Sequence, residues 1–455
     1  MTTQSLPREN VAANGGTDLM RRVLPWVIAV AVMLLVPWLF YNWNTGRHSG
    51  FVLTMMSEIG LMAIFALSFN MQMGQTGLLS FGHAILFGLG GYCTAHALNG
   101  VKAGTFWWPS ELIPLIGGFG GLAFGIAFGW VATKQRATAF AMITMGLGEL
   151  VAACALMFMG FFGGEGGIST DRVTNTSIFK LVYDLFGLDY RSLGINYSTP
   201  WQVYCLVVAW AVIATLLMRL QTQTPLGRIA NATRDNFERV QFVGYDPARV
   251  RFYQFALSGF FAGIAGGLYC LVYEIITFDT VAAAKSATAL LAAYIGGAGG
   301  FFGPILGTIL VVLLQSGVSL LSNAWLLYVG VLFIVMVMYA PGGIIGIIAQ
   351  HIPIVRIGRM SELIVPYIRV LLPGVLLVFG FVLLVELTSF TTIGAAQGKH
   401  FKIGIYVVDP NTFLPWTLGA AALVLGVVWL RLESRVFRRK WDALIEDAKA
   451  KGAML

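Results

Sequence analysis

Charged residues are scarce in this chain. Asp, Glu, Lys and Arg make up only 11% of its 455 residues, whereas 57% are hydrophobic. A water-soluble domain usually carries about 25% charged residues, so this composition excludes that class. We therefore predict an all-α fold, a polytopic membrane bundle of about 10–12 transmembrane helices, some of them discontinuous.

Residues that bind metals or carry out redox chemistry are also few. The four cysteines are widely spaced without a C-x-x-C pair, and the five histidines are scattered along the chain. We therefore predict no disulfide framework, no metal site and no catalytic residues. No G-x4-G-K-[ST] sequence occurs, so we expect no nucleotide to bind to this chain. We assign the net charge of +8 to cytoplasmic loops and expect no nucleic acid partner.

Long apolar runs recur along the whole sequence. A run of about 17 to 25 apolar residues can cross the hydrocarbon core as a helix. Such runs lie near residues 23–41, 51–71, 78–98, 112–132, 138–161, 200–219, 252–276, 325–346, 370–388 and 414–430. The stretch 286–321 is also apolar, but glycines interrupt it. It is either one long span or a broken pair of short helices. The broken pair could cross the membrane twice or form a re-entrant hairpin.

The loop charges favour the broken pair. Lys and Arg accumulate in loops on the cytoplasmic side. With the N-terminus inside, two short crossings within 286–321 place most basic loops in the cytoplasm. The resulting divisions are a cytoplasmic tail 1–22, a transmembrane domain 23–347 with a cytoplasmic segment 219–251, an extension 348–430 with two further spans, and a basic cytoplasmic tail 431–455.

Two glycine-rich segments, around Gly74 to Gly82 and around Gly296 to Gly307, interrupt the helices at membrane depth. Irregular backbone at this depth is tolerated where it is buried in protein or lines a cavity, so both segments are candidates for a transport path. Ordinary small-residue packing is the alternative for each residue taken singly. The candidate path residues are Asn70, Gln75, Ser80, His83, Gly296, Gly297, Gly299 and Gly303.

The segment 219–251 is predicted to carry a short amphipathic helix. Thr224 and Pro225 form a typical helix start, and Gly244 is a typical helix end about 18 residues later. Apolar residues recur on one face and charged residues fill the other, a pattern that favours docking to a cytoplasmic partner. Positive-inside topology is the alternative explanation of the arginines.

Three ionisable residues fall within the apolar spans. Glu58, His83 and Glu149 could carry protons in a proton-coupled secondary transporter, which is one class of function to consider. For the two glutamates, a protonated carboxyl hydrogen-bonded between helices is the simpler interpretation. Scattered groups do not form the chain that proton coupling needs.

Three ordered blocks of glycine and polar residues stand out along the chain. The first block is Asn70, Gly74, Gln75, Gly77, Ser80, Gly82, His83 and Ala84. The second is Thr224-Pro225-Leu226-Gly227-Arg228, Arg234-Asp235-Asn236 and Gly244. The third is Gly296, Gly297, Gly299, Gly303, Pro304 and Gly307, followed by Ala340-Pro341-Gly342-Gly343. Together they resemble one family, the permease subunits of bacterial ATP-binding-cassette importers for branched-chain amino acids, and the resemblance covers roughly residues 51–347.

The resemblance implies a role and a set of partners. The chain would be a multi-pass subunit of the bacterial inner membrane that moves branched-chain amino acids inward by alternating access. Two ATPase subunits that bind ATP and Mg²⁺, a second homologous permease and a periplasmic substrate-binding protein would complete the complex. Urea, short amides and aromatic carboxylates are alternative solutes within the same family. The residues implied to couple to the ATPase are Thr224, Pro225, Leu226, Gly227, Arg228, Arg234, Asp235, Asn236, Glu238 and Arg239.

The resemblance does not extend to the C-terminal region. Two further apolar spans and a basic tail follow residue 347. The tail combines arginines with Trp441, Leu444 and Ile445, which suits an amphipathic helix on anionic lipid. A topological stop signal is the equal alternative.

Overall fold

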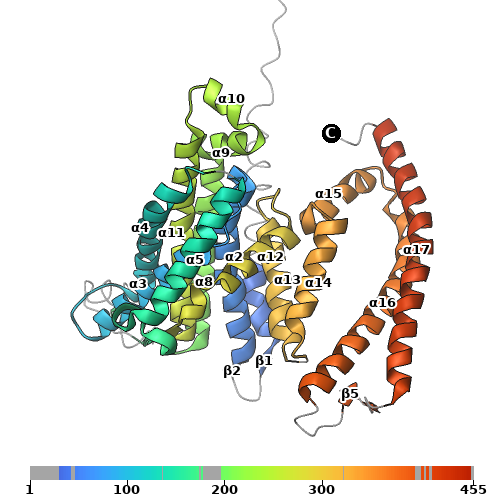
Figure 1. The fold of residues 1–455 in the computed structure, drawn as a ribbon, viewed down its shortest axis with the longest axis horizontal. Helices are drawn as coiled ribbons and strands as arrows, with labels where there is room; N and C mark the ends of the chain where they lie inside the picture. The colour runs from blue at the N-terminus through green and yellow to red at the C-terminus, as the bar shows by residue number, and fades with distance from the viewer. Residues whose placement is uncertain are drawn as a thin grey trace, which may run out of the picture. The chain divides into compact units, whose positions relative to one another are not determined.

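A computed structural model describes most of the chain as two compact units. The described residues are 30–42, 47–135, 137–173, 176–177, 196–320, 322–394, 401–403, 406–408 and 412–451. Unit 1 is Met1–Ala293 and unit 2 is Tyr294–Leu455. Figure 1 shows both units as assemblies of helices with only short hairpin strands.

Unit 1 contains the longer series of helices. They are α2 (Gly50–Thr76), α3 (Ala84–Lys102), α4 (Ile113–Ala132), α5 (Ala137–Met157), α6 (Met159–Phe162), α8 (Pro200–Gln223), α9 (Pro225–Asp235), α10 (Phe237–Phe242), α11 (Pro247–Tyr273) and most of α12 (Ala283–Gly296). The short turns are η1 (Ser110–Leu112), η2 (Gly164–Gly166) and η4 (Phe278–Thr280). Two antiparallel strand pairs, β1 (Tyr41–Asn42) with β2 (Arg47–His48) and β3 (Ile168–Ser169) with β4 (Ile275–Ile276), close two connections.

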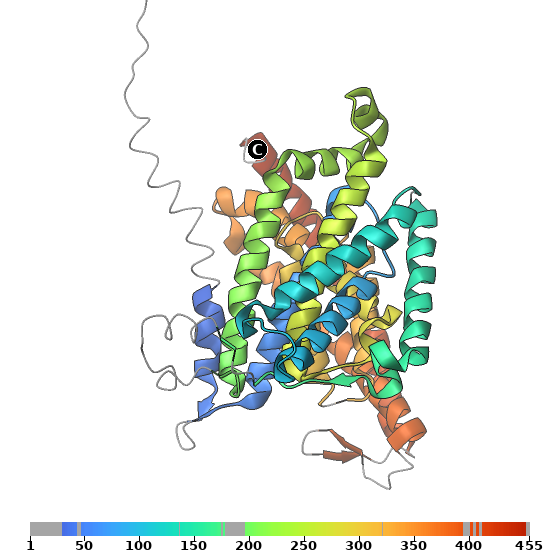
Figure 2. The same cartoon turned by 90° about the vertical axis from the view of Figure 1, so that its left-hand side faces the viewer.

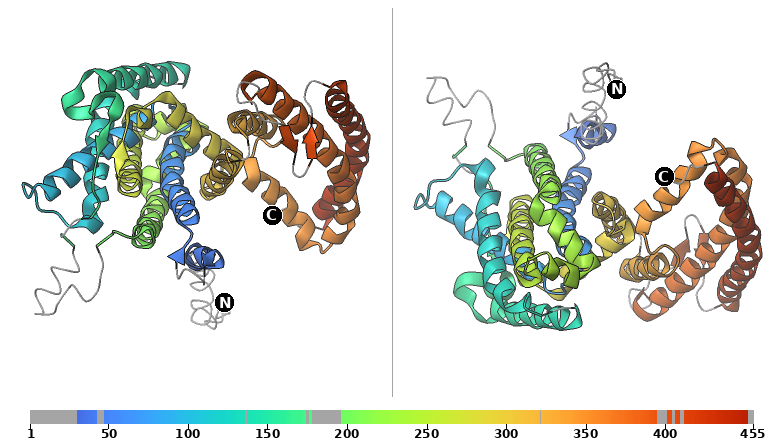
Figure 3. Two further views of the ribbon diagram at one scale, coloured as in Figure 1. Left: turned by 90° about the horizontal axis from the view of Figure 1, so that it is seen from below. Right: turned by 90° about the horizontal axis from the view of Figure 1, so that it is seen from above.

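Helix α11 is the centre of unit 1, and glycines bring its neighbours close to it. Gly259 and Gly263 of α11 face Gly117 and Gly121 of α4, so two G-x3-G pairs meet. A Cβ atom at Gly263 would lie 2.1 Å from the Gly117 carbonyl oxygen. Such backbone contact holds membrane helices together by dispersion forces, because burying apolar surface gains nothing in lipid. Helix α5 lies at the edge of the unit (Figure 3).

Helix α2 ends in a tight left-handed turn. Gly77 adopts φ 72°, and its N–H and that of Leu78 donate to the carbonyls of Met73 and Gln72. This pattern is a Schellman-type helix end, which favours glycine because a side chain is strained at positive φ. Residues 77–83 then run without helical structure to the start of α3. The predicted interruption near Gly74–Gly82 is thus present, but α2 continues as helix through Thr76.

Unit 2 contains the end of α12 and the remaining elements. They are α13 (Gly303–Val318), α14 (Trp325–Tyr339), α15 (Gly343–Arg356), η5 (Met360–Leu363), α16 (Ile364–Ser389), the π-helical turn η6 (Phe390–Gly394), the strand pair β5 (Phe401–Ile403) with β6 (Tyr406–Val408), and α17 (Phe413–Ala450). The stretch 286–321 therefore forms two helices, α12 and α13. The span predicted at 325–346 is not one straight helix, since α14 and α15 meet at a bend of 42°.

A glycine contact joins three of these helices. Cβ atoms placed on Gly296 and Gly297 would lie 1.8 Å from the Gly303 carbonyl oxygen and 2.3 Å from that of Gly342. Gly297 and Gly343 both have positive φ, 107° and 64°. Close backbone packing therefore explains these glycines.

The C-terminal extension is a helical hairpin. Figure 1 shows α16 and α17 as an antiparallel pair, and Gly380 and Gly426 bring their backbones close together. Helix α17 has 38 residues, roughly 57 Å at 1.5 Å per residue, so it continues well beyond the span predicted at 414–430. Trp441 and Ile445 pack on a buried cluster of Leu444 with Ile354 and Leu363. These tail residues contact their own chain, and the contact of the tail with lipid stays a prediction.

The helices confirm the predicted fold class. Among the described residues, seven helices are long and apolar enough to cross a membrane, or eight if the bent pair α14–α15 counts as one span. Shorter apolar helices occur at Val30–Leu39 and in α13. The chain is an all-α, multi-pass membrane protein. The start of the span predicted at 23–41 and the tail 1–22 lie outside the described residues.

Candidate functional site

His83 lies at the centre of a buried polar cluster in unit 1. Its side chain is fully buried. Nε2 is 2.9 Å from Ser68 Oγ, and Nδ1 is 3.2 Å from the Gln72 side-chain nitrogen. Because the Gln72 amide donates to Nδ1, and the Ser68 hydroxyl donates to the Phe65 carbonyl, the network assigns the proton of a neutral imidazole to Nε2. His83 thus joins the start of α3 to α2.

The same cluster reaches α11. The Gln72 side-chain nitrogen also lies 2.6 Å from Ser258 Oγ. One helical level away, Gln254 donates to Gln75 at 2.6 Å and accepts from Gln221 at 2.7 Å. These amides connect α2, α8 and α11. Buried hydrogen bonds between membrane helices contribute roughly 0.6 kcal/mol each on average, so they add to the glycine packing.

Two predicted path residues have unsatisfied atoms. Asn70 Oδ1 and Ser80 Oγ are buried and form no hydrogen bond with any residue that the structure describes. Together with Gln75 and His83, they lie inside unit 1. The four residues therefore gather at the interruption between α2 and α3. Their contact with a solute stays a prediction.

The glycines predicted for the path lie in unit 2. Gly296, Gly297 and Gly303 are needed for close backbone packing, whereas a Cβ at Gly299 would meet no atom within 4 Å. Of these four positions, only Gly299 has space for a side chain. Their part in a path also stays a prediction.

The segment 219–251 forms two helices where we expected one. Thr224 Oγ1 accepts from the Gly227 N–H at 3.3 Å, so the predicted helix start is confirmed. Helix α9 then ends at Asp235, because Asn236 adopts the extended values φ −157° and ψ 101°. The Asn236 side chain accepts from the Arg239 N–H at 3.0 Å and caps α10. Figure 2 shows α9 lying across the ends of the long helices.

Arg234 fixes α9 to the end of α2. Its Nη1 atom donates to the carbonyl oxygen of Gly74, one of the last carbonyls of α2, where an arginine also complements the helix dipole. Its Nε atom lies 3.0 Å from Asp235 Oδ1. A Cβ at Gly77 would lie only 3.2 Å from Arg234 Cγ. The guanidinium of Arg234 thus contacts its own chain, while 39% of the side chain stays exposed, and its contact with a partner stays a prediction.

A groove opens beside this contact. Its volume is about 410 Å³, and it lies between the end of α2, the start of α5 and the helices α9 and α10. Its lining residues are Thr76, Gly77, Leu78, Ala137, Thr233, Arg234, Asp235, Asn236, Phe237, Glu238 and Arg251. It thus brings three of the predicted coupling residues beside Arg234 and the interruption after α2.

The other predicted coupling residues are distributed over α9 and α10. Gly227 is buried against residues 221 and 222, where a Cβ would lie 2.4 Å from the Gln221 carbonyl. Leu226 is half-buried. Thr224, Pro225, Arg228, Glu238 and Arg239 are exposed. The exposed group is the part of the prediction that a partner could contact.

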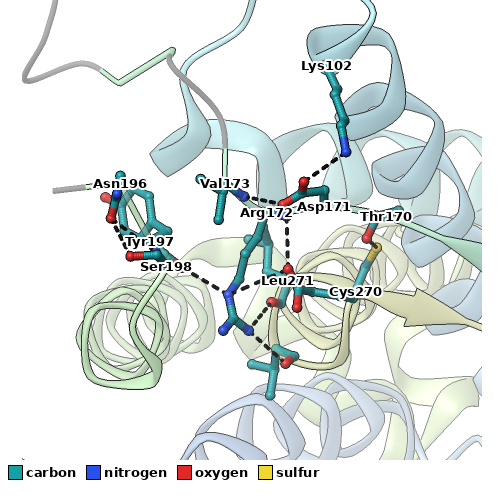
Figure 4. Close-up of polar contacts among 12 residues, drawn as sticks. Lys102, Thr170, Asp171, Arg172, Val173, Asn196, Tyr197, Ser198, Cys270 and Leu271 are labelled. Atoms are coloured by element: carbon teal, nitrogen blue, oxygen red, sulfur yellow. Dashed lines mark hydrogen bonds and ion pairs between the residues drawn. The ribbon is translucent and has the colours of Figure 1, made fainter.

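The β3–β4 end of unit 1 is organised by Arg172 (Figure 4). Its guanidinium donates to the carbonyls of Tyr197, Leu271 and Val272, and so satisfies the end of α11. Glu274 follows in the left-handed region with φ 55°, and its carboxylate accepts from the Arg172 N–H at 3.2 Å. Nearby, a hydrogen bond from Lys102 and a second from the Val173 N–H hold the pKa of Asp171 below its ordinary value.

Lys285, near the start of α12, is a half-buried residue that we did not predict. Lys285 Nζ is 5.0 Å from the ring centre of Tyr269 and 5.5 Å from that of Phe87. The Glu58 carboxylate interacts electrostatically with Lys285 and with Tyr273. A lysine inside an apolar run was the signal that could have identified this group from the sequence.

The ionisable residues of the spans do not form one chain of groups. His83 is buried among polar residues, Glu58 belongs to the lysine cluster, and Glu149 is exposed on α5. Within the described part of the chain, no three His, Cys, Asp or Glu side chains gather as a possible metal site.

Comparisons with known proteins agree with the three sequence blocks. A family model described as "Branched-chain amino acid transport system / permease component" matches residues 51–341. The high-affinity branched-chain amino acid transport system permease protein LivM of Escherichia coli is 28% identical over 291 residues, covering 62% of this chain and 67% of that protein. LivM of Salmonella typhimurium is 27% identical over the same shares of both chains. A probable LivM of Methanocaldococcus jannaschii is 24% identical, covering 63% of this chain and 90% of that protein. No solved structure matches the chain.

Proposed function

This chain belongs to the family of branched-chain amino acid transport system permease components, and on that premise we propose that it is the membrane subunit of an ATP-driven importer. It carries branched-chain amino acids inward across the bacterial inner membrane, with its N-terminus in the cytoplasm. Its α9–α10 end then faces the cytoplasm, and its β3–β4 end faces outward. Two ATPase subunits supply bound ATP and Mg²⁺, and a second permease and an external binding protein complete the complex.

The observation that carries this proposal is the contact of Arg234 with the Gly74 carbonyl. Helix α9 lies across the long helices, with exposed residues such as Arg228 available to a partner. A motion of α9 is passed through Arg234 to the end of α2. From there it reaches residues 77–83, the segment before His83 and α3.

Alternating access then consists of a change at this interruption. The Schellman-type turn at Gly77 ends α2 without continuing its axis. The buried amides hold α2 to α8 and α11, so they resist movement below the interruption. Asn70 and Ser80 have polar atoms without partners among the described residues, and these atoms are free to form new bonds when the segment moves. Irregular backbone at such a position is typical of transporters.

The test compares two arginines of the same end of unit 1. In proteoliposomes with the complete complex, Arg234→Met should lower ATP-driven leucine uptake at least tenfold while ATP hydrolysis continues. Arg249→Met is the matched control, because Arg249 is exposed and its ion pair among the described residues is with Asp246, at 3.4 Å. Its uptake should equal that of the wild type. Equal uptake by both variants would contradict the coupling role of Arg234.

The competing class is tested in the same vesicles. A secondary transporter takes up solute when a proton gradient is imposed and needs no ATPase. We expect uptake only with ATP inside the compartment that contains the ATPase subunits. Uptake by the chain alone on an imposed gradient would replace the importer proposal. Urea, short amides and aromatic carboxylates, supplied as competitors, identify the solute class within the family.

A further inference from the structure

Lys285 lies in an unusual environment for a lysine. Its ammonium group lies over the rings of Tyr269 and Phe87. It forms no ion pair and no side-chain hydrogen bond with the residues that the structure describes. The side chain is half-buried and therefore reachable from the surface of unit 1. Aromatic faces attract a cation but leave its hydrogen-bond donors unused.

The backbone fixes the position of this lysine. At Gly88 of α3, a Cβ would lie 2.3 Å from Val281 Cγ1, so the chain before α12 packs directly on α3. One residue beyond Lys285, Ser286 Oγ accepts from the Ala84 N–H at 2.8 Å. These two contacts bracket Lys285. The ammonium group is therefore held at a defined place beside α3 and α11.

An acid faces the lysine from α2. Glu58 is half-buried and lies within electrostatic range of Lys285, but the two form no direct ion pair. Tyr273 interacts with the same carboxylate, and its ring is tilted by 40° against that of Tyr269, with centroids 4.5 Å apart. The cluster thus presents a cation, an acid and apolar ring faces near the β3–β4 end of the helices.

We propose that this cluster binds the transported amino acid as a zwitterion. Lys285 binds the solute carboxylate, and Glu58 with Tyr273 binds the ammonium group. The half-buried ring of Tyr269 contacts the apolar side chain of the solute. This assignment rests on the proposed function and names its solute site, because opposite charges held apart match the two charges of an amino acid and the rings match its apolar part.

The binding test uses three probes that differ by one charged group. Leucine carries both charges, 4-methylpentanoate lacks the ammonium group and 3-methylbutylamine lacks the carboxylate. Saturation-transfer NMR measures the binding of each probe to the purified complex in nanodiscs without the external binding protein. The wild type should bind leucine most tightly.

Two substitutions should separate the probes. Lys285→Met should weaken the binding of leucine and 4-methylpentanoate at least tenfold and leave the binding of 3-methylbutylamine unchanged. Glu58→Gln should weaken the binding of leucine and 3-methylbutylamine and leave the binding of 4-methylpentanoate unchanged. Lys285→Arg keeps the charge and should retain most of the leucine binding. A loss of packing would instead weaken all three probes together.

The outcomes are distinct. Equal binding by all variants, equal loss of all three probes, or no binding to the wild type would each overturn the zwitterion site. The proposed function is judged separately, by ATP-driven leucine uptake in wild-type vesicles. Wild-type uptake together with any of those three binding results would leave the importer standing and remove only the site.

Discussion

Helices α11 and α17 are both apolar enough to cross a membrane, yet they are stabilised in different ways. In the most apolar window of α11, 78% of the residues are buried, against 17% for α17. Unit 1 surrounds α11 with glycine contacts and buried amides. The hairpin of α16 and α17 has one glycine seam and exposes most of its apolar side chains. Hydrophobicity alone therefore places a helix in the bilayer but does not decide whether it enters a core.

The hairpin uses polar contacts mainly at its ends. Near one end, Tyr328 of α14 donates to Glu386 of α16 at 2.6 Å. Near the other, Arg359 pairs with Glu362 at 2.6 Å and with Asp447 at 2.8 Å. Unit 1 also has polar contacts at helix ends, but buried side chains such as His83 and Gln254 add hydrogen bonds between helices inside the unit. A membrane unit with a central polar core is thus specified in more places than a hairpin joined at its ends.

The largest effect is expected where a side chain is forced into the core of unit 1. Gly263→Val places atoms against the backbone of α4, where even a Cβ would be 2.1 Å from the Gly117 oxygen. We expect destabilisation above about 3 kcal/mol and little folded protein. Fluorescence-detected size exclusion after heating measures the folded fraction.

A glycine of the hairpin provides the control for this substitution. At Gly374 in α16, a Cβ would meet no atom within 4 Å. Gly374→Val should therefore behave like the wild type in the same heating experiment. A similar loss of folded protein for both variants would contradict the comparison between the two regions.

The next effect concerns the bond between α14 and α16. Tyr328→Phe leaves Glu386 without its phenol partner, and we expect a loss of about 1–3 kcal/mol. Tyr328→Phe combined with Glu386→Leu removes both polar groups and should recover most of the stability. The melting temperature in nanodiscs measures both. Wild-type melting of the single variant would show that the bond does not stabilise the hairpin.

A smaller and local effect is expected at the break between α9 and α10. Asn236→Ala removes the cap that accepts from the Arg239 N–H, and we expect α10 to lose about 1 kcal/mol. Amide hydrogen exchange in residues 237–242 should accelerate severalfold. Exchange in α11 serves as the internal control, and equal acceleration there would indicate a global change.

The smallest effect should appear at acidic pH at the β3–β4 end. The folded pKa of Asp171 lies below its ordinary value because of Lys102 and the Val173 N–H. The pair therefore stabilises the fold above the ordinary pKa, and this stabilisation disappears as the pH falls through the lower folded pKa. The side chains of Lys102 and Asp171 are 58% and 39% exposed, so solvent reduces the effect.

Melting temperatures between about pH 6 and pH 3 test this pair. The decrease in melting temperature on acidification should be slightly smaller for Asp171→Asn than for the wild type, because the variant has no carboxylate to protonate at this position. A larger drop in the variant would reverse the assigned sign.

Much of the helical arrangement was predictable from periodicity and glycine. The run of apolar residues located α2, α4, α8 and α11, and Thr224 located the start of α9. The extended conformation of Asn236 was not predictable, because asparagine serves equally well inside a polar helix face and as a cap. A helix in the tail beyond residue 430 was one of the two alternatives, but its continuity with the span at 414–430 in the single helix α17 was not predicted.

The site was predictable only in part. His83 and Gln75 were predicted at the interruption of α2 and lie there, whereas the contact of Arg234 with the end of α2 was not predicted. The partners of Gln75 and Arg234 lie far away in the sequence. Gln254 is separated from Gln75 by 179 residues and Arg234 from Gly74 by 160. No local pattern reports such pairs. Lys285 could be identified from the sequence only as a single lysine within an apolar run.

The turn at Gly77 also has an evolutionary consequence. Its positive φ tolerates asparagine better than other replacements, but any Cβ there would approach Arg234 Cγ to 3.2 Å. A lineage that acquires asparagine at position 77 should therefore also change position 234, to a residue whose side chain is smaller or of a different length. The two positions should covary across the family, and a library that randomises both would recover them as matched pairs.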